Sequence, residues 1–145
     1  MPLTKLERES FLAEPGLVAT LSVAGPGNRG PLAVPVWYHY LPGSDPWILT
    51  WATSRKTRLI EAAQAFTLTI ARSQPTVRYL AVDGPVGLIE SSTGRQLEEV
   101  TKRYLSANLL DRYLSTLIPR LDELVTVHLK PKYWNSADLG VNYLD

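Results

Sequence analysis

Apolar and polar residues alternate in several short segments of the chain, and this pattern predicts β-strands. In residues 66–71, for example, Phe66, Leu68 and Ile70 fall on one face. Short turns rich in Gly and Pro separate most of these segments, so neighbouring strands are expected to pair antiparallel. The predicted strands cover residues 17–23, 31–41, 47–51, 66–71, 76–90 and 123–131.

Helical spacing of apolar residues marks the other regular segments. Two of them begin with a capping box, Thr4 with Glu7 and Thr93 with Gln96. The segment after residue 131 is aromatic and polar without a clear period, so it is expected to be irregular. The predicted helices cover residues 4–13, 54–63 and 93–119, the last being one helix or two helices broken near Asn108.

Six strands with one main helical excursion predict a mainly β fold, a small antiparallel barrel with helices packed outside. The 145 residues favour a single domain over 1–145. The strand over 31–41 contains Pro35, which cannot donate a ladder hydrogen bond. This strand is therefore expected at an edge or a bulge, where something other than a strand can lie against it.

Composition narrows the possible functions. With 15 basic and 14 acidic residues the net charge is +1, which does not indicate general affinity for nucleic acid or anionic membranes. The absence of cysteine excludes disulfides, thiolate metal sites and a Cys nucleophile. The first residues lack a long apolar core, and no apolar run is long enough to span a membrane, so a cytoplasmic protein without membrane contact is expected.

One turn of this nearly neutral chain is strongly basic. In the stretch ILTWATSRKTRLIEAA, residues 48–63, the cations Arg55, Lys56 and Arg58 stand where a strand passes into a helix. They could simply form the solvated face of a surface helix, as charge runs usually do. However, the first turn of a helix carries unpaired N–H groups and a partial positive charge, which disfavours cations unless an anion binds there.

Hydroxyl groups accompany these cations. Thr50, Thr53 and Ser54 supply hydrogen-bond donors of the kind that phosphate sites use. The turn therefore predicts a site for a phosphate monoester. The remainder of such a ligand could lie against aromatic side chains, although any one of these is more often in a core or a subunit interface. The candidate aromatic residues are Trp37, Tyr38, Tyr40, Trp47, Trp51, Tyr79 and Trp134.

Three motifs in this order resemble the pyridoxamine-5′-phosphate-oxidase-like, flavin-binding split-barrel superfamily. T-x-x-x-S-R-K, from Thr50 to Lys56, is similar to its flavin-phosphate motif. PLAVPVWY (31–38) resembles the preceding strand, and RYLAVDGPV (78–86) is similar to a later strand with a glycine bend. The resemblance implies a six-stranded split barrel that forms a homodimer, with cofactor sites at the subunit interface.

The resemblance also implies roles for particular residues. Ser54, Arg55 and Lys56 would hold the phosphate with support from Thr50, while Trp51 and Tyr79 are further candidates for cofactor contact. Arg58 matches a Lys-x-Arg pattern of the small relatives that use deazaflavin. No arginine follows Arg120, so the vitamin B6 substrate site of the true oxidases is not expected. The residues expected to border the ring or ribityl chain are Pro35, Val36 and Trp37.

The expected function is therefore that of an FMN-dependent oxidoreductase, which transfers hydride between the flavin and a small or planar organic substrate. A deazaflavin-dependent reductase, a non-catalytic cofactor carrier and, as the weakest alternative, a nucleic-acid-binding protein remain open. No residue stands out as catalytic, and no metal site is expected, because His39 and His128 lack metal-spaced partners. His128 is expected at the surface, whereas His39 is a candidate for contact with the substrate.

Overall fold

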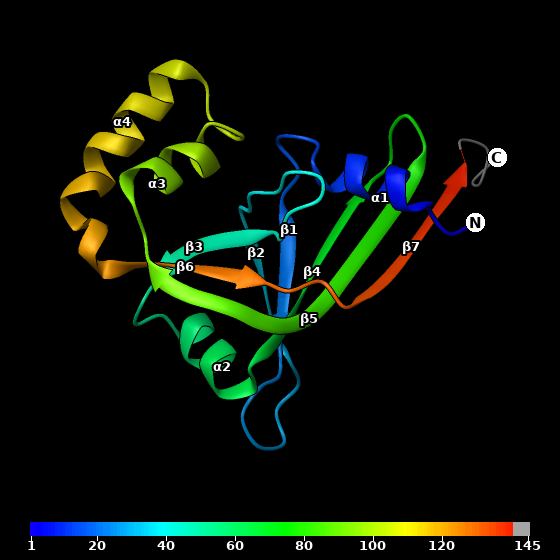
Figure 1. Ribbon diagram of the computed structural model, residues 1–145, viewed down its shortest axis with the longest axis horizontal. Helices are drawn as coiled ribbons and strands as arrows, with labels where there is room; N and C mark the ends of the chain where they lie inside the picture. The colour runs from blue at the N-terminus through cyan, green and yellow to red at the C-terminus, as the bar shows by residue number, and fades with distance from the viewer. Residues whose placement is uncertain (141–145) are drawn as a thin grey trace.

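The computed structural model describes residues 1–140 and contains seven strands, four α-helices and one 3₁₀ helix (Figure 1). The strands are β1 (Ala19–Val23), β2 (Leu32–Val36), β3 (Trp47–Trp51), β4 (Ala65–Arg72), β5 (Val77–Ser91), β6 (Leu124–Leu129) and β7 (Tyr133–Gly140). The helices are α1 (Lys5–Leu12), α2 (Arg55–Ala63), α3 (Gly94–Thr101), α4 (Ala107–Leu117) and the 3₁₀ helix η1 (Ile118–Glu123).

The strands form one antiparallel sheet in the order β2-β1-β4-β5-β6-β3. The long strand β5 connects both parts of the sheet, because its first half pairs with β4 and β7 and its second half pairs with β6. The sheet thereby curls into a split barrel with helices outside it (Figure 1). The predicted mainly β class and antiparallel pairing are confirmed, while the prediction of a single domain over 1–145 stays untested.

The strand that contains Pro35 lies at one end of this sheet, as predicted. It is shorter than expected, because regular pairing ends at Val36. The chain then continues to an isolated bridge between His39 and Trp47. This bridge brings the segment after β2 against β3, the strand at the other end of the sheet, so the two ends of the barrel approach each other.

The expectation of an irregular C-terminal segment was wrong, because residues Tyr133–Gly140 form β7. This strand has no simple alternation of apolar and polar residues. It forms because β6 pairs only with the second half of β5, which leaves an edge free along Val77–Asp83. The end of the aromatic segment, 141–145, lies outside the described residues.

Gly84 allows two parts of the chain to cross closely. A β-carbon at this position would lie 2.0 Å from the Lys130 carbonyl oxygen, so no side chain fits where the link from β6 to β7 passes β5. The sequence predicted a bulge or bend at Gly84–Pro85. The register between β5 and β6 is irregular slightly further on, between Val86 and Leu88.

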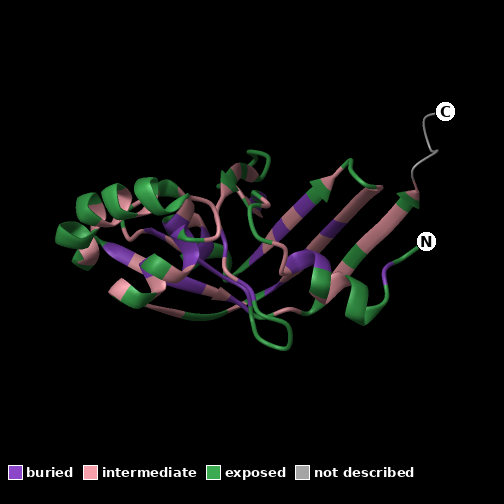
Figure 2. Cartoon of the chain, turned by 90° about the horizontal axis from the view of Figure 1, so that it is seen from above, coloured by how far each residue is buried: buried purple, intermediate pink, exposed green. Residues whose placement is uncertain are grey.

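The core lies inside the curl of the sheet. Phe66, Leu68 and Ile70 are buried, as their alternation predicted. α1 closes one side with Phe11 and Leu12, which are fully buried. Figure 2 shows the buried positions as bands along the strands, with exposed residues concentrated on helices and loops.

Both predicted capping boxes are present at the starts of α1 and α3. The long helical region is broken over residues 102–106, a few positions before the predicted break at Asn108. No residue of α4 is fully buried. Across residues 1–140, no helix has the length and apolar character needed to cross a membrane.

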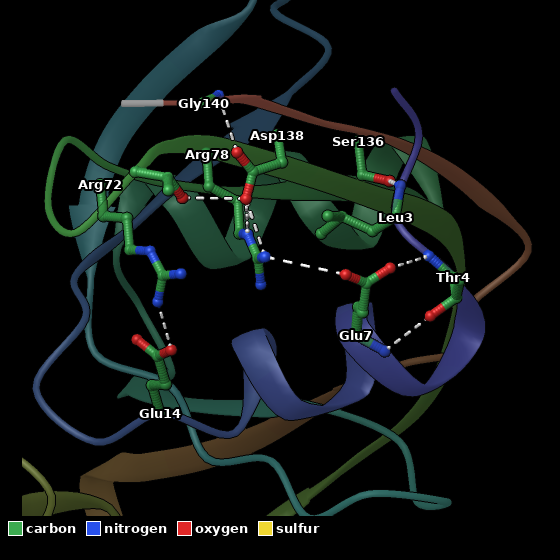
Figure 3. Close-up of polar contacts among 10 residues, drawn as sticks. Leu3, Thr4, Glu7, Glu14, Arg72, Arg78, Ser136, Asp138 and Gly140 are labelled. Atoms are coloured by element: carbon green, nitrogen blue, oxygen red, sulfur yellow. Dashed lines mark hydrogen bonds and ion pairs between the residues drawn. The ribbon is translucent and has the colours of Figure 1, made fainter. Parts of the chain in front are cut away.

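Ion pairs link the α1 region to β4 and β5, and β7 to β5 (Figure 3). Arg78 on β5 contacts Asp138 of β7 through Nη2 at 2.8 Å and through Nε at 2.9 Å. Its guanidinium also lies 3.8 Å from a Glu7 carboxylate oxygen on α1. Arg72 on β4 pairs with Glu14, just after α1. Two cations with little solvent exposure are thus matched by three carboxylates.

Candidate functional site

A pocket of about 210 Å³ lies where the end of β2, strand β3, the start of α2 and one side of α4 meet. It brings together six of the residues that the sequence singled out. They come from the end of β2 and the residue after it, from β3 and from the start of α2. β2 and β3 are far apart in the sheet order, and their approach explains why these residues meet. These six residues are Pro35, Val36, Trp37, Thr50, Trp51 and Lys56.

Lys56 is the cation of this pocket. Its Nζ donates a hydrogen bond of 2.6 Å to Thr50 Oγ1. Burial lowers the pKa of Lys56, because desolvation disfavours its charged form. Within the part of the chain that the structure describes, no carboxylate forms an ion pair with Lys56. A half-buried ammonium with only a hydroxyl partner favours binding of an anion.

The start of α2 is organised by Ser54, the N-cap residue. Ser54 Oγ accepts from the Thr57 backbone N–H at 3.2 Å and lies 2.9 Å from Thr57 Oγ1. The Thr57 hydroxyl in turn donates to the Trp51 carbonyl oxygen at 2.7 Å. The proton of Ser54 is therefore engaged by Thr57 in this arrangement, and direct contact between Ser54 and a phosphate stays a prediction.

Thr50 keeps a donor available for a ligand. Its Oγ1 accepts from Lys56, and the next hydroxyl, Ser54 Oγ, lies 3.4 Å away, which makes a weak hydrogen bond at best. The Thr50 hydroxyl hydrogen can therefore point into the pocket beside the ammonium. Thr50 and Lys56 together offer an anion one hydroxyl donor and one charged donor.

Arg55 and Arg58 are exposed and do not line the pocket. Arg58 Nη1 donates to the Thr53 carbonyl oxygen at 3.1 Å, which holds its side chain beside the turn. The first turn of α2 contains no acidic residue. Both arginines therefore leave the start of α2 positively charged, and contact with a cofactor stays a prediction for each.

Tyr79 is not brought to this pocket. It lies on the first half of β5, where it pairs with Ala71 of β4 and Ala137 of β7. Its predicted contact with a cofactor therefore has no support from the arrangement of a single chain.

Sequence reasoning missed one wall of the pocket. Tyr113 and Leu117 reach it from α4, while Leu49 and Leu124 add apolar surface from β3 and β6. The spacing of leucines in α4 identified its apolar side, but nothing in the spacing showed which part of the barrel it would cover. A further missed neighbour is Arg120, whose guanidinium lies 4.4 Å from the ring centre of Trp51.

The two histidines lie away from the pocket. His39 stacks on Trp47 with ring centres 4.7 Å apart and does not line this pocket, and its contact with a substrate stays a prediction. His128 Nε2 lies 2.6 Å from Glu90 Oε2, and its side chain is 21% exposed, so it is partly exposed beside this carboxylate, and a surface role stays a prediction. Among residues 1–140, no group of three potential ligands could hold a metal ion.

Comparison with solved structures identifies the architecture. A conserved hypothetical protein from Mycobacterium tuberculosis matches with a TM-score of 0.76 and 19% identity, over 99% of this chain and 89% of that one. An F420 reductase matches with a TM-score of 0.69 and 21% identity, over 87% and 94% of the two chains. A FAD-binding protein from Mesorhizobium loti matches with a TM-score of 0.61 and 18% identity, over 95% of each chain.

The chain has the fold of the flavin-binding split-barrel superfamily. The resemblance recognised in its motifs is thus confirmed at the level of the fold. No family model matches the sequence. No curated protein matches it either. The site must therefore be assigned from its own residues.

Proposed function

We propose that the protein is an FMN-dependent oxidoreductase that acts on a small or planar organic molecule. The observation that carries this proposal is the Lys56 ammonium at the start of α2, which is partly desolvated and has no carboxylate partner among residues 1–140. Thr50 beside it provides a hydroxyl donor. These are the donors that a terminal phosphate needs, since charge-assisted hydrogen bonds to phosphate are strong.

The walls of the pocket suit a planar group attached to that phosphate. Trp37, Trp51 and Tyr113 offer aromatic surface, and Pro35 carries no backbone N–H. At about 210 Å³, the pocket is smaller than the roughly 300 Å³ at the lower end for complete ligand sites. A homodimer in which the second subunit closes the pocket is therefore part of the proposal.

A bound flavin would supply the hydride chemistry itself. The residues of this chain would bind and orient it: Lys56 and Thr50 at the phosphate, Trp37 and Trp51 along the planar part. Apolar walls would exclude water from the reacting face.

A deazaflavin coenzyme is the second candidate, and one observation favours it. Arg55 and Arg58 are exposed beside the turn and have no acidic neighbour in the first turn of α2. They could attract a cofactor whose acidic tail extends beyond the phosphate. The F420 reductase among the similar structures agrees with this alternative. A carrier of either cofactor without turnover would use the same contacts.

The direct test is the absorption spectrum and mass of the molecule that co-purifies with the protein. A flavin spectrum with the mass of FMN supports the main proposal, and reduction by a nicotinamide cofactor with turnover of an acceptor establishes an enzyme. Preferential binding of deazaflavin selects the alternative. Failure of the purified protein to bind FMN, FAD or deazaflavin would refute both.

A further inference from the structure

The aromatic wall of the pocket is fixed from behind by the connection between α3 and α4. The ring of Tyr104, in this connection, stacks on Trp37 with centres 4.8 Å apart and an interplanar angle of 4°. Tyr113 approaches Trp37 with a tilt of 46° and a centre distance of 5.7 Å. Trp37 and Tyr113 line the pocket, whereas Tyr104 does not.

Tyr104 is itself held in place by hydrogen bonds at its hydroxyl group. Its hydroxyl donates to the Leu17 carbonyl oxygen at 2.8 Å, just before β1. The Tyr104 hydroxyl oxygen also accepts a hydrogen bond of 3.1 Å from the backbone N–H of Tyr38, which directly follows Trp37. One side chain therefore supports the indole of Trp37 and satisfies the backbone next to it.

The neighbouring residue makes this connection rigid. Arg103 donates to three backbone carbonyl oxygens: Ala13 at 3.5 Å, Tyr40 at 3.4 Å and Glu14 at 3.2 Å. Its guanidinium also lies 5.0 Å from the ring centre of Tyr38. These contacts hold the segment between α3 and α4 against the rest of the fold, so Tyr104 has a defined position within it.

We propose that Tyr104 is a positioning residue, which holds the Trp37 indole as a flat wall and thereby strengthens binding of the planar part of the ligand. This inference rests on the proposed function, since it assigns a role at the same site. A tryptophan at the end of an edge strand would otherwise sample several rotamers. Fixing it before the ligand arrives reduces the conformational entropy lost on binding.

The planar and anionic parts of the site can be tested separately with riboflavin and inorganic phosphate. Tyr104→Leu removes the stack, so riboflavin should bind about two- to tenfold more weakly. The ability of inorganic phosphate to compete with FMN at Lys56 should be the same in this variant as in the wild type. Tyr104→Phe keeps the ring and should retain more of the riboflavin affinity than Tyr104→Leu. Tyr133→Leu, at an exposed tyrosine of β7, serves as the matched control.

A second readout does not depend on any ligand. Near-ultraviolet circular dichroism of the free protein should lose the signal of the ordered Trp37 in Tyr104→Leu, as it does in Trp37→Leu. In a double-mutant cycle, the effects of Tyr104→Leu and Trp37→Leu on riboflavin binding should overlap, whereas those of Tyr104→Leu and Lys56→Ala on FMN binding should add.

Unchanged riboflavin affinity and an unchanged Trp37 signal in folded Tyr104→Leu would overturn the inference. Equal weakening of riboflavin and phosphate binding would also overturn it, because it would mean a general loss of structure. If the wild-type protein binds no flavin, the proposed function fails. The spectral comparison of Tyr104→Leu with Trp37→Leu then still decides whether Tyr104 positions Trp37.

Discussion

Two groups of basic residues in this molecule differ in how their charge is balanced. On β4 and β5, Arg72 and Arg78 are each only 17% exposed, and each is paired with a carboxylate. At the start of α2, Lys56 is also partly buried, but its partner is the hydroxyl of Thr50. The charges of Arg72 and Arg78 are balanced by carboxylates within the protein, whereas the charge of Lys56 is available to an anion.

The comparison shows that the absence of an internal partner, more than the number of cations, marks a candidate anion site. Arg72 on β4 and Arg78 on β5 link these strands to the α1 region and to β7, which is a structural task (Figure 3). Within the described part of the chain, Lys56 forms no ion pair with another element of the fold. Removing Lys56 should therefore affect binding, and breaking the arginine pairs should affect stability.

The largest expected effect is on FMN binding by Lys56→Ala. The variant loses a charge-assisted contact of about 1.5–3 kcal/mol, so FMN affinity should fall about ten- to a hundredfold. Unfolding should be little affected, because loss of the hydrogen bond to Thr50 is offset by removal of a desolvated charge. Titration of FMN fluorescence and thermal melting measure the two quantities, and Lys130→Ala, at an exposed lysine, is the control. Unchanged FMN affinity would mean that the phosphate binds elsewhere.

The pH dependence of FMN binding should reveal the same contact. Burial lowers the pKa of Lys56 in the free protein, and a bound anion would raise it again by favouring the charged form. Affinity should therefore be highest below the lowered pKa and decline as the pH rises through it, before an ordinary lysine would titrate. Binding isotherms at increasing pH check this decline.

In Lys56→Ala the same alkaline decline should be absent. The folding stability of the ligand-free wild-type protein should show the opposite dependence on pH. The unfolded chain binds the Lys56 proton more tightly, so stability should rise with pH through this window. An alkaline decline in FMN affinity that persists in Lys56→Ala would assign the titration to another group.

In the paired group, the main expected effect is on stability. The Gly140 backbone N–H, the Thr76 hydroxyl and Arg78 all donate to Asp138, and they lower its pKa from 3.8 to about 2. Because the folded pKa is the lower one, this contribution is present above pH 3.8 and is lost as the pH falls toward 2. Asp138→Asn should therefore lower the melting temperature at neutral pH.

The acid unfolding of Asp138→Asn should also lack the component seen between pH 3.8 and 2 in the wild type. Asp122→Asn, at an exposed carboxylate, is the matched control and should melt like the wild type. FMN affinity should change in neither variant. Loss of FMN binding in folded Asp138→Asn would contradict the separation between the two basic groups.

The smallest expected effect belongs to Arg58→Ala. This side chain is exposed and bonded to the Thr53 carbonyl oxygen, so its interaction with an anion is screened by water. FMN affinity should fall only about two- to fivefold. A larger loss for a deazaflavin with an acidic tail than for FMN would favour the second candidate, and titration of both cofactors measures the difference.

Much of the fold was predictable because local patterns and tertiary structure agree. The alternation of Phe66, Leu68 and Ile70 and the two capping boxes each specify an element through neighbouring residues alone. β7 was missed because its pairing depends on an edge left free along β5, between 50 (Asp83 to Tyr133) and 63 (Val77 to Gly140) residues earlier in the chain. A weakly patterned strand of this kind is determined by its partner rather than by its own sequence.

The site was predictable to a similar degree. Thr50, Ser54 and Lys56 lie within one strand-to-helix turn, so their proximity follows from the sequence. Tyr104 and Tyr113 reach Trp37 from a distant helical region, and helical spacing does not reveal which strand a helix will cover. The N-cap role of Ser54, which engages its hydroxyl, likewise emerged only from the hydrogen bonds around Thr57.

The central claim is that an anionic phosphate binds at Lys56, and the affinities of FMN and riboflavin for the wild-type protein test it most directly. The two ligands share the planar ring and differ only in the phosphate. The account predicts that FMN binds about ten- to a hundredfold more tightly at neutral pH and low salt. Equal affinities would contradict it, because they would show that the phosphate makes no favourable contact with the protein.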